Sequence, residues 1–399
     1  MIKRRIFIVL FLVTSAIVNA QTVDIQKLHP FVNLEKGNFK DAVDELSVLI
    51  SENHEKGFLL ARIEAYFMLG DYENALIECN QLEKIEEGIA SEYLLKIYLQ
   101  KNDIHKAEQK LLENLKSDYK ISLFLLKNND EFKKIQESDF MDSILSTNIY
   151  SATEKYLFKV EQLIHSGNYS DALFLVNELA NRNPNIAQAY YFLSKINIHN
   201  NQLNDAKYYI DKALELKSNK VEYLVTRIQI NMNLENFKDA SVDIDKAIRL
   251  NPYFLDLYLL KAEILLNNKE YDKAIEQSNF YLALYPNNSD ALYVLAKSYF
   301  NKGENFEALK NINESLNAKK SAGQYELRGD IYSKTGTCQF AEMDYSMALD
   351  LEAQNGEIWA KKGFARFKTN NKAGACSDWE KGKRHGSLKA IEYLEKYCK

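Results

Sequence analysis

The sequence lacks the short motifs that identify the common classes of enzyme. It contains no GxxxxGK(S/T) phosphate loop, no HExxH zinc motif, no CxxC pair and no GxSxG nucleophile elbow. No familiar motif therefore supplies a phosphate cradle, a metal site or an activated nucleophile. We predict a protein without catalytic activity, cofactor or metal. The alternative is an enzymatic or carbohydrate-handling protein whose site these motifs do not reveal.

Basic residues are also fewer than acidic ones. The chain carries 51 Lys and Arg residues against 56 Asp and Glu residues, a formal net charge of −5. A nucleic-acid surface needs a dense basic face, so this balance argues against such a partner. Most of the 25 tyrosines fall at positions that recur along the sequence, which favours packing over base stacking. We expect a protein or peptide partner and no nucleic acid.

A long apolar run occurs only near the start of the chain. Three basic residues at 3–5 precede the apolar run Ile6–Val18, and Ala20 supplies the small residue that signal peptidase needs. The run is shorter than the roughly 20 residues that span a bilayer, so we predict a signal peptide over 1–20 rather than an anchor. Gln21 follows where a lipoprotein would have cysteine. The mature chain would carry a charge of −8, have no membrane span, and lie in the periplasm or envelope.

What the sequence does contain is a regular series of alanines. Successive members are 32 to 34 residues apart, except for one gap of 65 residues. The series consists of Ala42, Ala75, Ala107, Ala172, Ala206, Ala240, Ala274, Ala308, Ala341 and Ala375. A period near 34 through most of a chain indicates stacked structural repeats, and such arrays generally bind other molecules.

Residues that end and begin helices keep step with these alanines. Gly or Asn, which tolerate a left-handed backbone, stands five positions before eight of them, for example at Gly70 and Asn201. Good N-cap residues such as Asp71 often follow, and prolines that stop a helix lie twelve positions after three of the alanines. Each unit therefore reads as a helix, a tight turn, a second helix that carries the alanine, and a stop.

This pattern resembles the tetratricopeptide repeat (TPR). The best match has small and aromatic residues at the family's positions, namely Tyr325, Gly329, Tyr332, Gly336, Ala341, Tyr345 and Ala348. A second match offers Trp359, Gly363, Ala375 and Trp379, although other units lack the first-helix glycine. The resemblance implies an all-α, right-handed superhelical solenoid of about ten to eleven antiparallel helix pairs. It covers roughly residues 23 to 386.

The 65-residue gap divides the predicted array. We expect an N-terminal array over 21–116, a degenerate repeat or bend over 117–152, a C-terminal array over 153–386 and a capping helix over 387–399. Apolar clusters at 121–126 and 140–145 favour a degraded helical pair over a plain linker. Within this segment, Asp142-Ser143-Ile144 resembles the sequence glycosylated in exported Bacteroidetes proteins, so Ser143 is a candidate for O-glycosylation, against the default of an unmodified serine.

The four cysteines fit an exported protein with at most a disulfide or two. Cys376 lies early in the last second helix and Cys398 ends the predicted capping helix. At about 1.5 Å per residue the two sulfurs reach the same height if the helices are antiparallel. We predict a Cys376–Cys398 disulfide, with Cys338 as the competing partner of Cys376. The closing segment also resembles the ends of many exported Bacteroidetes TPR proteins.

In the TPR family the first helix of each repeat lines a concave binding groove. The groove positions that the resemblance implies here are Tyr191, Lys195, Gln229, Glu263, Tyr293, Lys297, Glu326, Asp330 and Lys334. Two Tyr-Lys pairs recur among them at a spacing of four residues. Such a pair can stack, donate a hydrogen bond and hold a carboxylate, although an ordinary solvated helix face is an equal alternative. We predict a non-catalytic scaffold or adaptor that holds a peptide or partner subunit in this groove.

Two histidines at the same repeat position are the one metal possibility that we considered. His165 and His199 stand 34 residues apart, near the ends of successive first helices. They could lie side by side on the inner surface, but two polar residues that end their helices explain the pattern more simply. We therefore predict no metal site there.

Overall fold

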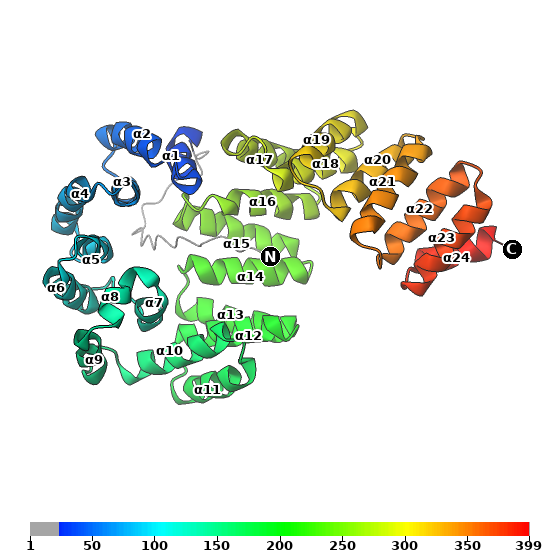
Figure 1. Ribbon diagram of the computed structural model, residues 1–399. Coiled ribbons are helices and arrows are strands. Elements are labelled where there is room, and N and C mark those ends of the chain that lie inside the picture. Colours follow the sequence, from blue (N-terminus) through cyan, green and yellow to red (C-terminus); the bar gives the residue numbers. More distant parts are fainter. Residues whose placement is uncertain (1–23, 399) are drawn as a thin grey trace. The chain divides into compact units, whose positions relative to one another are not determined.

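The computed structural model describes residues 24–398, and within them the chain is entirely helical, with no strand (Figure 1). It forms two compact units that meet at Leu255 and Asp256. The predicted signal peptide lies outside the described residues. Among those residues, no helix has the length and apolar character needed to cross a bilayer.

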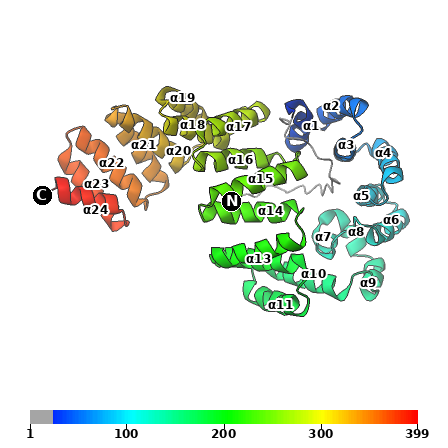
Figure 2. The ribbon, with the colours of Figure 1, turned by 180° about the vertical axis from the view of Figure 1, so that it is seen from behind.

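Within its described residues, 24–255, unit 1 contains fifteen α-helices and one short 3-10 helix. These are α1 (Ile25–Lys36), α2 (Phe39–Glu52), α3 (Lys56–Leu69), α4 (Tyr72–Ile85), α5 (Ser91–Gln100), α6 (Ile104–Lys116), α7 (Leu123–Asn128), η1 (Asp130–Phe132), α8 (Lys133–Gln136), α9 (Asp139–Ser146), α10 (Ala152–His165), α11 (Tyr169–Arg182), α12 (Ala187–His199), α13 (Leu203–Leu216), α14 (Val221–Asn233) and α15 (Phe237–Leu250). In its first part, α3 and α5 lie on the inner side of the row and α4 and α6 on the outer side, as Figures 1 and 2 both show.

Unit 2 consists of nine helices within its described residues. These are α16 (Asp256–Asn267), α17 (Tyr271–Leu284), α18 (Ser289–Lys302), α19 (Asn305–Ala318), α20 (Ala322–Lys334), α21 (Cys338–Leu351), α22 (Gly356–Lys368), α23 (Lys372–Arg384) and α24 (Leu388–Tyr397). Consecutive helices pack as pairs in both units, which confirms the predicted all-α solenoid.

The periodic alanines lie where the two helices of each pair touch. All ten are on second helices and have no exposed surface. A methyl group at this position lets the backbones of the two helices approach closely, because a larger side chain would have no space to occupy. The regular spacing of the alanines therefore marks the contact between the two helices in each regular repeat.

The turn before each second helix is also uniform. All ten residues five positions before the alanines have a positive φ, between 59° and 93°. Eight are the Gly and Asn residues predicted from the sequence, but the other two are Glu235 (φ 59°) and Lys269 (φ 62°). The helical hairpin thus imposes a left-handed residue even where a side chain makes that conformation unfavourable.

Helix ends follow the predicted signals. Asp71, Asp103, Asn168 and Asn371 each accept a hydrogen bond from a backbone N–H of the helix that they begin. The helices that precede the three periodic prolines end two residues earlier, at Arg182, Leu250 and Leu284. These devices satisfy the terminal backbone groups that a helix leaves unpaired.

Two first-helix glycines allow a large aromatic ring to pack on the backbone. A Cβ atom at Gly329 would stand 2.7 Å from the Tyr345 ring, and one at Gly363 would stand 2.5 Å from the Trp379 indole. Trp379 has no exposed surface, and its indole N–H donates to the Ala360 carbonyl at 3.0 Å. The glycine–aromatic pair is therefore a single packing unit within a repeat.

The segment 117–152 folds into four short helical elements, α7 to α9 with η1. Its apolar side chains, including Phe132, Ile135 and Ile144, are buried and form one cluster with residues of α5 and α6. The buried Tyr150 hydroxyl donates to the Ile121 carbonyl at 2.8 Å. The segment therefore shares a packed core with α5 and α6. The division into compact units lies elsewhere, at Leu255–Asp256.

The last helix, α24, covers the open face of the final repeat. Tyr393 and Tyr397 lie against Trp379, with ring centroids 5.2 and 5.8 Å from it. Cys376 and Cys398 stand at bonding distance with Cα atoms 5.9 Å apart, while Cys338 is unpaired. The two cysteines are thus placed as a Cys376–Cys398 disulfide requires. That this bond forms in the cell stays a prediction.

A distant part of unit 1 packs on the first helices of the first two repeats. Tyr253, in the loop after α15, stacks on Phe31 of α1 with ring centroids 4.3 Å apart and lies 5.5 Å from Phe58 of α3. The Tyr253 hydroxyl also donates to the Glu55 carboxylate, 198 residues away in the chain. We call Phe31, Phe58, Glu55 and Tyr253 the aromatic clasp of unit 1.

Candidate protein-binding faces

The nine predicted groove residues all lie on first helices, but they fall on two units. Tyr191, Lys195 and Gln229 are on α12 and α14 of unit 1, and the other six are on α16, α18 and α20 of unit 2. Lys195, Gln229 and Lys334 are exposed, whereas the rest are partly buried. Each unit therefore presents its own candidate face, and most of its predicted residues have some contact within the fold.

The two Tyr-Lys pairs adopt the expected geometry. The Lys195 ammonium lies 5.4 Å from the centre of the Tyr191 ring, and the Lys297 ammonium lies 5.7 Å from the centre of the Tyr293 ring. Both are cation–π distances. Tyr191 also stacks on Tyr223 of α14 at 4.8 Å. The aromatic side chains are thus fixed by neighbours, while each lysine extends from the ring.

Burial changes the acidity of these tyrosines. Desolvation, followed by the nearby Glu222 carboxylate, raises the pKa of Tyr191 to about 12. Desolvation, followed by the carboxylates of Glu326 and Asp330, raises the pKa of Tyr293. Both hydroxyls therefore stay protonated at neutral pH and can donate a hydrogen bond to a partner.

Glu326 and Asp330 are already engaged by a residue that the sequence reasoning missed. Lys361 of α22 contacts the Glu326 carboxylate at 2.6 Å and the Asp330 carboxylate at 2.7 Å. Asp330 also accepts a hydrogen bond from the Tyr345 hydroxyl at 2.8 Å. Lys361 lies about one repeat later in the chain, so the period places it beside these acids. The three residues form a link between neighbouring repeats.

Glu263 and Lys334 have different surroundings. Desolvation, followed by repulsion from the Asp290 carboxylate, raises the pKa of Glu263. Lys334 lies at the end of α20, where its ammonium donates to the Phe300 carbonyl at 3.3 Å and stands 4.7 Å from the Phe300 ring centre. Lys334 thus links two first helices, and Glu263 adds negative charge to the face of unit 2.

A repeated ion pair also joins neighbouring repeats. Arg227 of α14 forms a two-point contact with Asp243 of its own repeat, at 2.6 and 2.7 Å, and reaches Asp211 of the preceding repeat at 2.9 Å. Arg328 does the same with Asp344 and with Asn313. Hydrogen bonds to the acids raise the pKa of both arginines above its usual value. Each bidentate pair joins the two helices of one repeat, and the third contact of each arginine reaches the preceding repeat.

The spacing of this pair is a signal that could have been read from the sequence. The cation stands thirteen residues before the periodic alanine and the acid three after it. The same offsets hold for His29 with Glu45 and for Arg62 with Glu78, both of which are in contact. The pattern is irregular because most of the other repeats lack the cation, the acid or both at these positions.

Unit 1 contains a partly buried acidic group on an inner helix. Desolvation raises the pKa of Glu64 on α3 to about 7, and the nearby Lys96 ammonium opposes this shift. Lys96 is itself held by Glu92 at 2.7 Å and Glu131 at 3.0 Å. The cluster joins α3, α5 and η1, so it extends the contact between the regular repeats and the segment 117–152.

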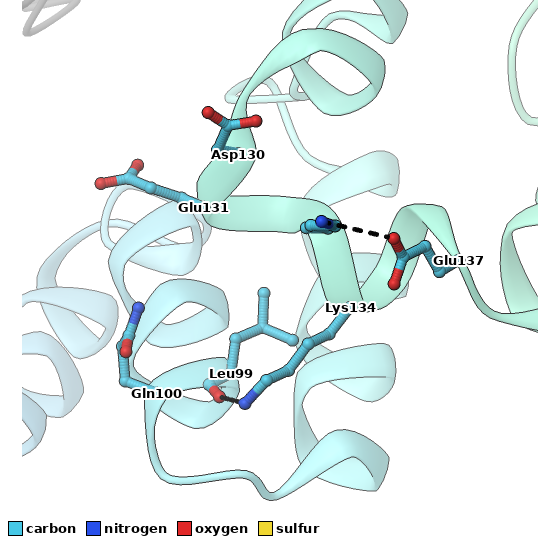
Figure 3. Close-up of a pocket in the computed structure, with 7 residues that line it drawn as sticks. Leu99, Gln100, Asp130, Glu131, Lys134 and Glu137 are labelled. Atoms are coloured by element: carbon cyan, nitrogen blue, oxygen red, sulfur yellow. Dashed lines mark hydrogen bonds and ion pairs between the residues drawn. The ribbon is translucent and has the colours of Figure 1, made fainter.

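A small depression of about 230 Å³ lies beside this cluster (Figure 3). Its walls come from α5, η1 and α8, and Lys134 crosses it to donate to the Leu99 carbonyl at 2.9 Å. Asp130, Glu131 and Glu137 supply the negative charge, so the walls are mixed in sign. Nothing in this arrangement selects a particular small ligand.

The remaining candidate residues have ordinary surroundings. The His199 ring stacks on Tyr169 at 3.6 Å and the His165 ring stands 5.7 Å from the Phe124 ring. Within residues 24–398, no group of three potential metal ligands is found. Ser143 is exposed on α9, and its hydroxyl donates to the Phe140 carbonyl at 2.7 Å. Its glycosylation stays a prediction.

The fold defines the class of the protein. Stacked helical hairpins with buried periodic alanines, left-handed turns and inward first helices are those of a TPR-like repeat protein, whose architecture serves as a scaffold for protein interaction. The chain belongs to the ChAPs family (Chs5p-Arf1p-binding proteins), whose model matches residues 117–335. None of the curated proteins matches the sequence.

Solved structures give the same fold. A tetratricopeptide repeat protein from Parabacteroides merdae aligns with a TM-score of 0.54 and 17% identity, over 63% of this chain and 100% of that chain. The Cut9–Hcn1 hetero-tetramer of the APC/C aligns with a TM-score of 0.50 and 14% identity, over 94% of this chain and 96% of that chain. None of these descriptions names a catalytic activity.

Proposed function

We propose that this chain is a non-catalytic protein-binding scaffold of the bacterial periplasm or envelope. The proposal holds that the first-helix faces bind an extended peptide or a partner subunit. The observation that carries it is the pair of ordered Tyr-Lys sites, one on each unit, on the side of the repeats that faces inward in TPR proteins. The family name, which describes proteins that bind Chs5p and Arf1p, supports a protein partner.

The chemistry of the two faces fits a peptide. At each site a protonated tyrosine hydroxyl can donate to a backbone carbonyl, and the adjacent lysine can hold a carboxylate. Because the tyrosine rings are already fixed by packing, binding loses little side-chain entropy. Among the acidic groove residues of unit 2, Glu326 and Asp330 are engaged by Lys361, so Glu263 is the position that can receive a cationic side chain of the peptide.

The proposed compartment rests on the sequence of residues 1–20. A basic start, a thirteen-residue apolar run and a small residue at position 20 support export and cleavage before Gln21. In an oxidising compartment the Cys376–Cys398 pair would be a disulfide. N-terminal sequencing of the protein from envelope fractions tests this part, and an intact Met1 would contradict it.

The binding role is tested by alanine substitutions at Tyr191, Lys195, Tyr293 and Lys297. We expect the variant to lose capture of a stoichiometric partner from envelope extracts. The lysine substitutions should cost about 0.5 kcal/mol of stability each. Each tyrosine substitution should cost about 1 kcal/mol more, because its ring packs on neighbours, so unfolding curves must show that the variant is folded. A matched control changes Lys310, Lys320, Tyr208 and Lys246, which lie on second helices or a connecting loop. Equal capture by both variants would contradict the proposal, and turnover of a substrate by the isolated chain would favour an enzyme.

A further inference from the structure

The end of unit 2 differs in charge from the rest of the chain. Residues 356–398 contain ten Lys and Arg residues but five Asp and Glu residues, a net charge of +5 within a chain whose net charge is −5. Within the described residues, the ion pairs of this region involve only Lys361 and Arg366. The other eight cations therefore have no acidic partner in the fold.

Three of these residues form an ordered cluster. The Trp359 ring of α22 has the Lys362 ammonium 5.1 Å from its centre and the Lys381 ammonium of α23 4.4 Å from it. The ring is fixed because its indole N–H donates to the Ala353 carbonyl at 2.9 Å, and it is only partly buried. We call Trp359, Lys362 and Lys381 the tryptophan–lysine cluster.

The cluster arises because this repeat does not form the ion pair that four other repeats form at the same positions. Lys362 stands thirteen residues before Ala375, where four other repeats have the paired cation, and Asp378 stands three residues after it. Here Asp378 is instead contacted by Arg366 at 2.9 Å. Lys362 is left without an ion pair. Desolvation lowers its pKa, and repulsion from Arg366 and Lys381 adds to the shift although Asp378 and Glu342 oppose it.

Two like charges are thus held beside one aromatic ring, and neither forms an ion pair: the nearest acid, Asp378, is contacted by Arg366. An incoming carboxylate would relieve their repulsion, and an apolar neighbour of that carboxylate would cover the ring. The negative balance of the remaining chain repels an extended polyanion such as a nucleic acid or an anionic bilayer, but it affects a short acidic segment much less.

We propose that the tryptophan–lysine cluster binds an acidic, partly apolar segment of a partner protein. This proposal rests on the proposed scaffold function and adds a second contact site, on a surface other than the Tyr-Lys faces. Lys362 and Lys381 hold carboxylates of the segment, and Trp359 packs against an apolar side chain between them. A partner that reaches both sites gains affinity from their linkage.

The test uses the full mature chain and a synthetic peptide of Glu-Leu-Glu-Gly repeats. Binding is followed by tryptophan fluorescence, since the chain has two tryptophans and Trp379 is fully buried. Double substitution K362E/K381E should weaken binding about tenfold, which corresponds to loss of two charge contacts. The same peptide with glutamine in place of glutamate should not bind.

A matched control is available on the same two helices. K368E/K372E makes an equal change of charge, and Lys368 lies about 14 Å further along α22 than Trp359. We expect this control to change affinity less than about threefold. Unfolding curves of both variants establish that the fold is kept. If K362E/K381E weakens peptide binding but leaves partner capture at the Tyr-Lys faces unchanged, the two sites act separately, and failure of one proposal can be told from failure of the other.

Three outcomes would overturn the proposal. Equal binding of the glutamate and glutamine peptides would show that charge is not recognised. Equal losses in K362E/K381E and K368E/K372E would show that net charge alone attracts the peptide. Binding of phosphatidylglycerol vesicles without binding of the peptide would identify a membrane surface as the ligand instead.

Discussion

The first and last repeats each have a neighbouring repeat on one side only, and different parts of the chain pack on them. At the C-terminal end, α24 follows directly in sequence and brings Cys398 beside Cys376. At the N-terminal end, the loop residue Tyr253 of unit 1 closes over Phe31 and Phe58. The capping helix can be predicted from the sequence because it directly follows the last repeat. The contact of Tyr253 with α1 cannot, because it depends on how the fourteen intervening α-helices curve.

The largest expected effect concerns the local cap. Replacing Cys376 and Cys398 by serine should destabilise the end of unit 2 by about 3 kcal/mol under oxidising conditions, because the bond would close a loop of 22 residues. Hydrogen exchange should accelerate in α23 and α24 while the middle repeats stay protected. Cys338→Ser is the control. Unchanged exchange in α24, or a Cys338–Cys376 peptide in non-reducing maps, would contradict the pairing.

A smaller effect is expected at the aromatic clasp of unit 1. Tyr253→Ala removes two aromatic contacts, so the clasp should weaken by about 2 kcal/mol. Exchange should accelerate in α1 to α3, and unit 2 should be unaffected. Tyr253→Phe keeps the ring stacking and should lose only the hydrogen bond to Glu55, with about half the effect. Equal protection of α1 in all three proteins would mean that the clasp does not hold the first repeat.

The stability of unit 1 should also depend on pH through Glu64. Its folded-state pKa of about 7 lies above the ordinary value of 4.5, so folding favours the protonated form. The free energy of unfolding should therefore fall as the pH rises from about 4.5 to 7 and change no further through this group above pH 7. Glu64→Gln should remove this dependence, on the order of 1 kcal/mol. Exposed Glu52→Gln serves as control, and an identical pH profile in both variants would contradict the assignment.

The smallest effect concerns the left-handed turns. Lys269→Gly should stabilise unit 2 by about 0.5 kcal/mol, because relief of the left-handed backbone slightly exceeds the added entropy of the unfolded chain. Gly303→Ala, at the same turn of the next repeat, should destabilise it by about 1 kcal/mol. Thermal unfolding of the two variants measures the difference. A loss of stability in Lys269→Gly would show that the lysine side chain contributes contacts that offset its strain.

The sequence predicted most of the repeats because their signals are local and periodic. Each alanine is buried, and eight of the ten left-handed turns occur at Gly or Asn. Glu235 and Lys269 could not be predicted in that conformation, since neither side chain favours it. The candidate faces were found from the positions that line the groove in the TPR family. The role of Lys361 was missed. It could have been found by looking for opposite charges about one repeat apart, as Lys361 and Glu326 are.

The aromatic clasp and the tryptophan–lysine cluster were beyond the sequence reasoning for different physical reasons. Tyr253 reaches its partners only because the helical pairs of unit 1 curve, and no residue pattern specifies that curvature directly. Nothing in the sequence distinguishes Lys362 from other lysines, and its lack of an ion pair follows only from the contact of Arg366 with Asp378.

The central claim, that the first-helix faces bind a protein partner, is tested most directly by site-specific photo-crosslinking in cells. A photoreactive residue at Gln229 or Lys297, on first helices, is compared with one at Val242 or Lys310, on second helices. The account predicts that the first pair crosslinks one protein in high yield and that the second pair does not. Crosslinks to the same protein from the second-helix positions alone would contradict it.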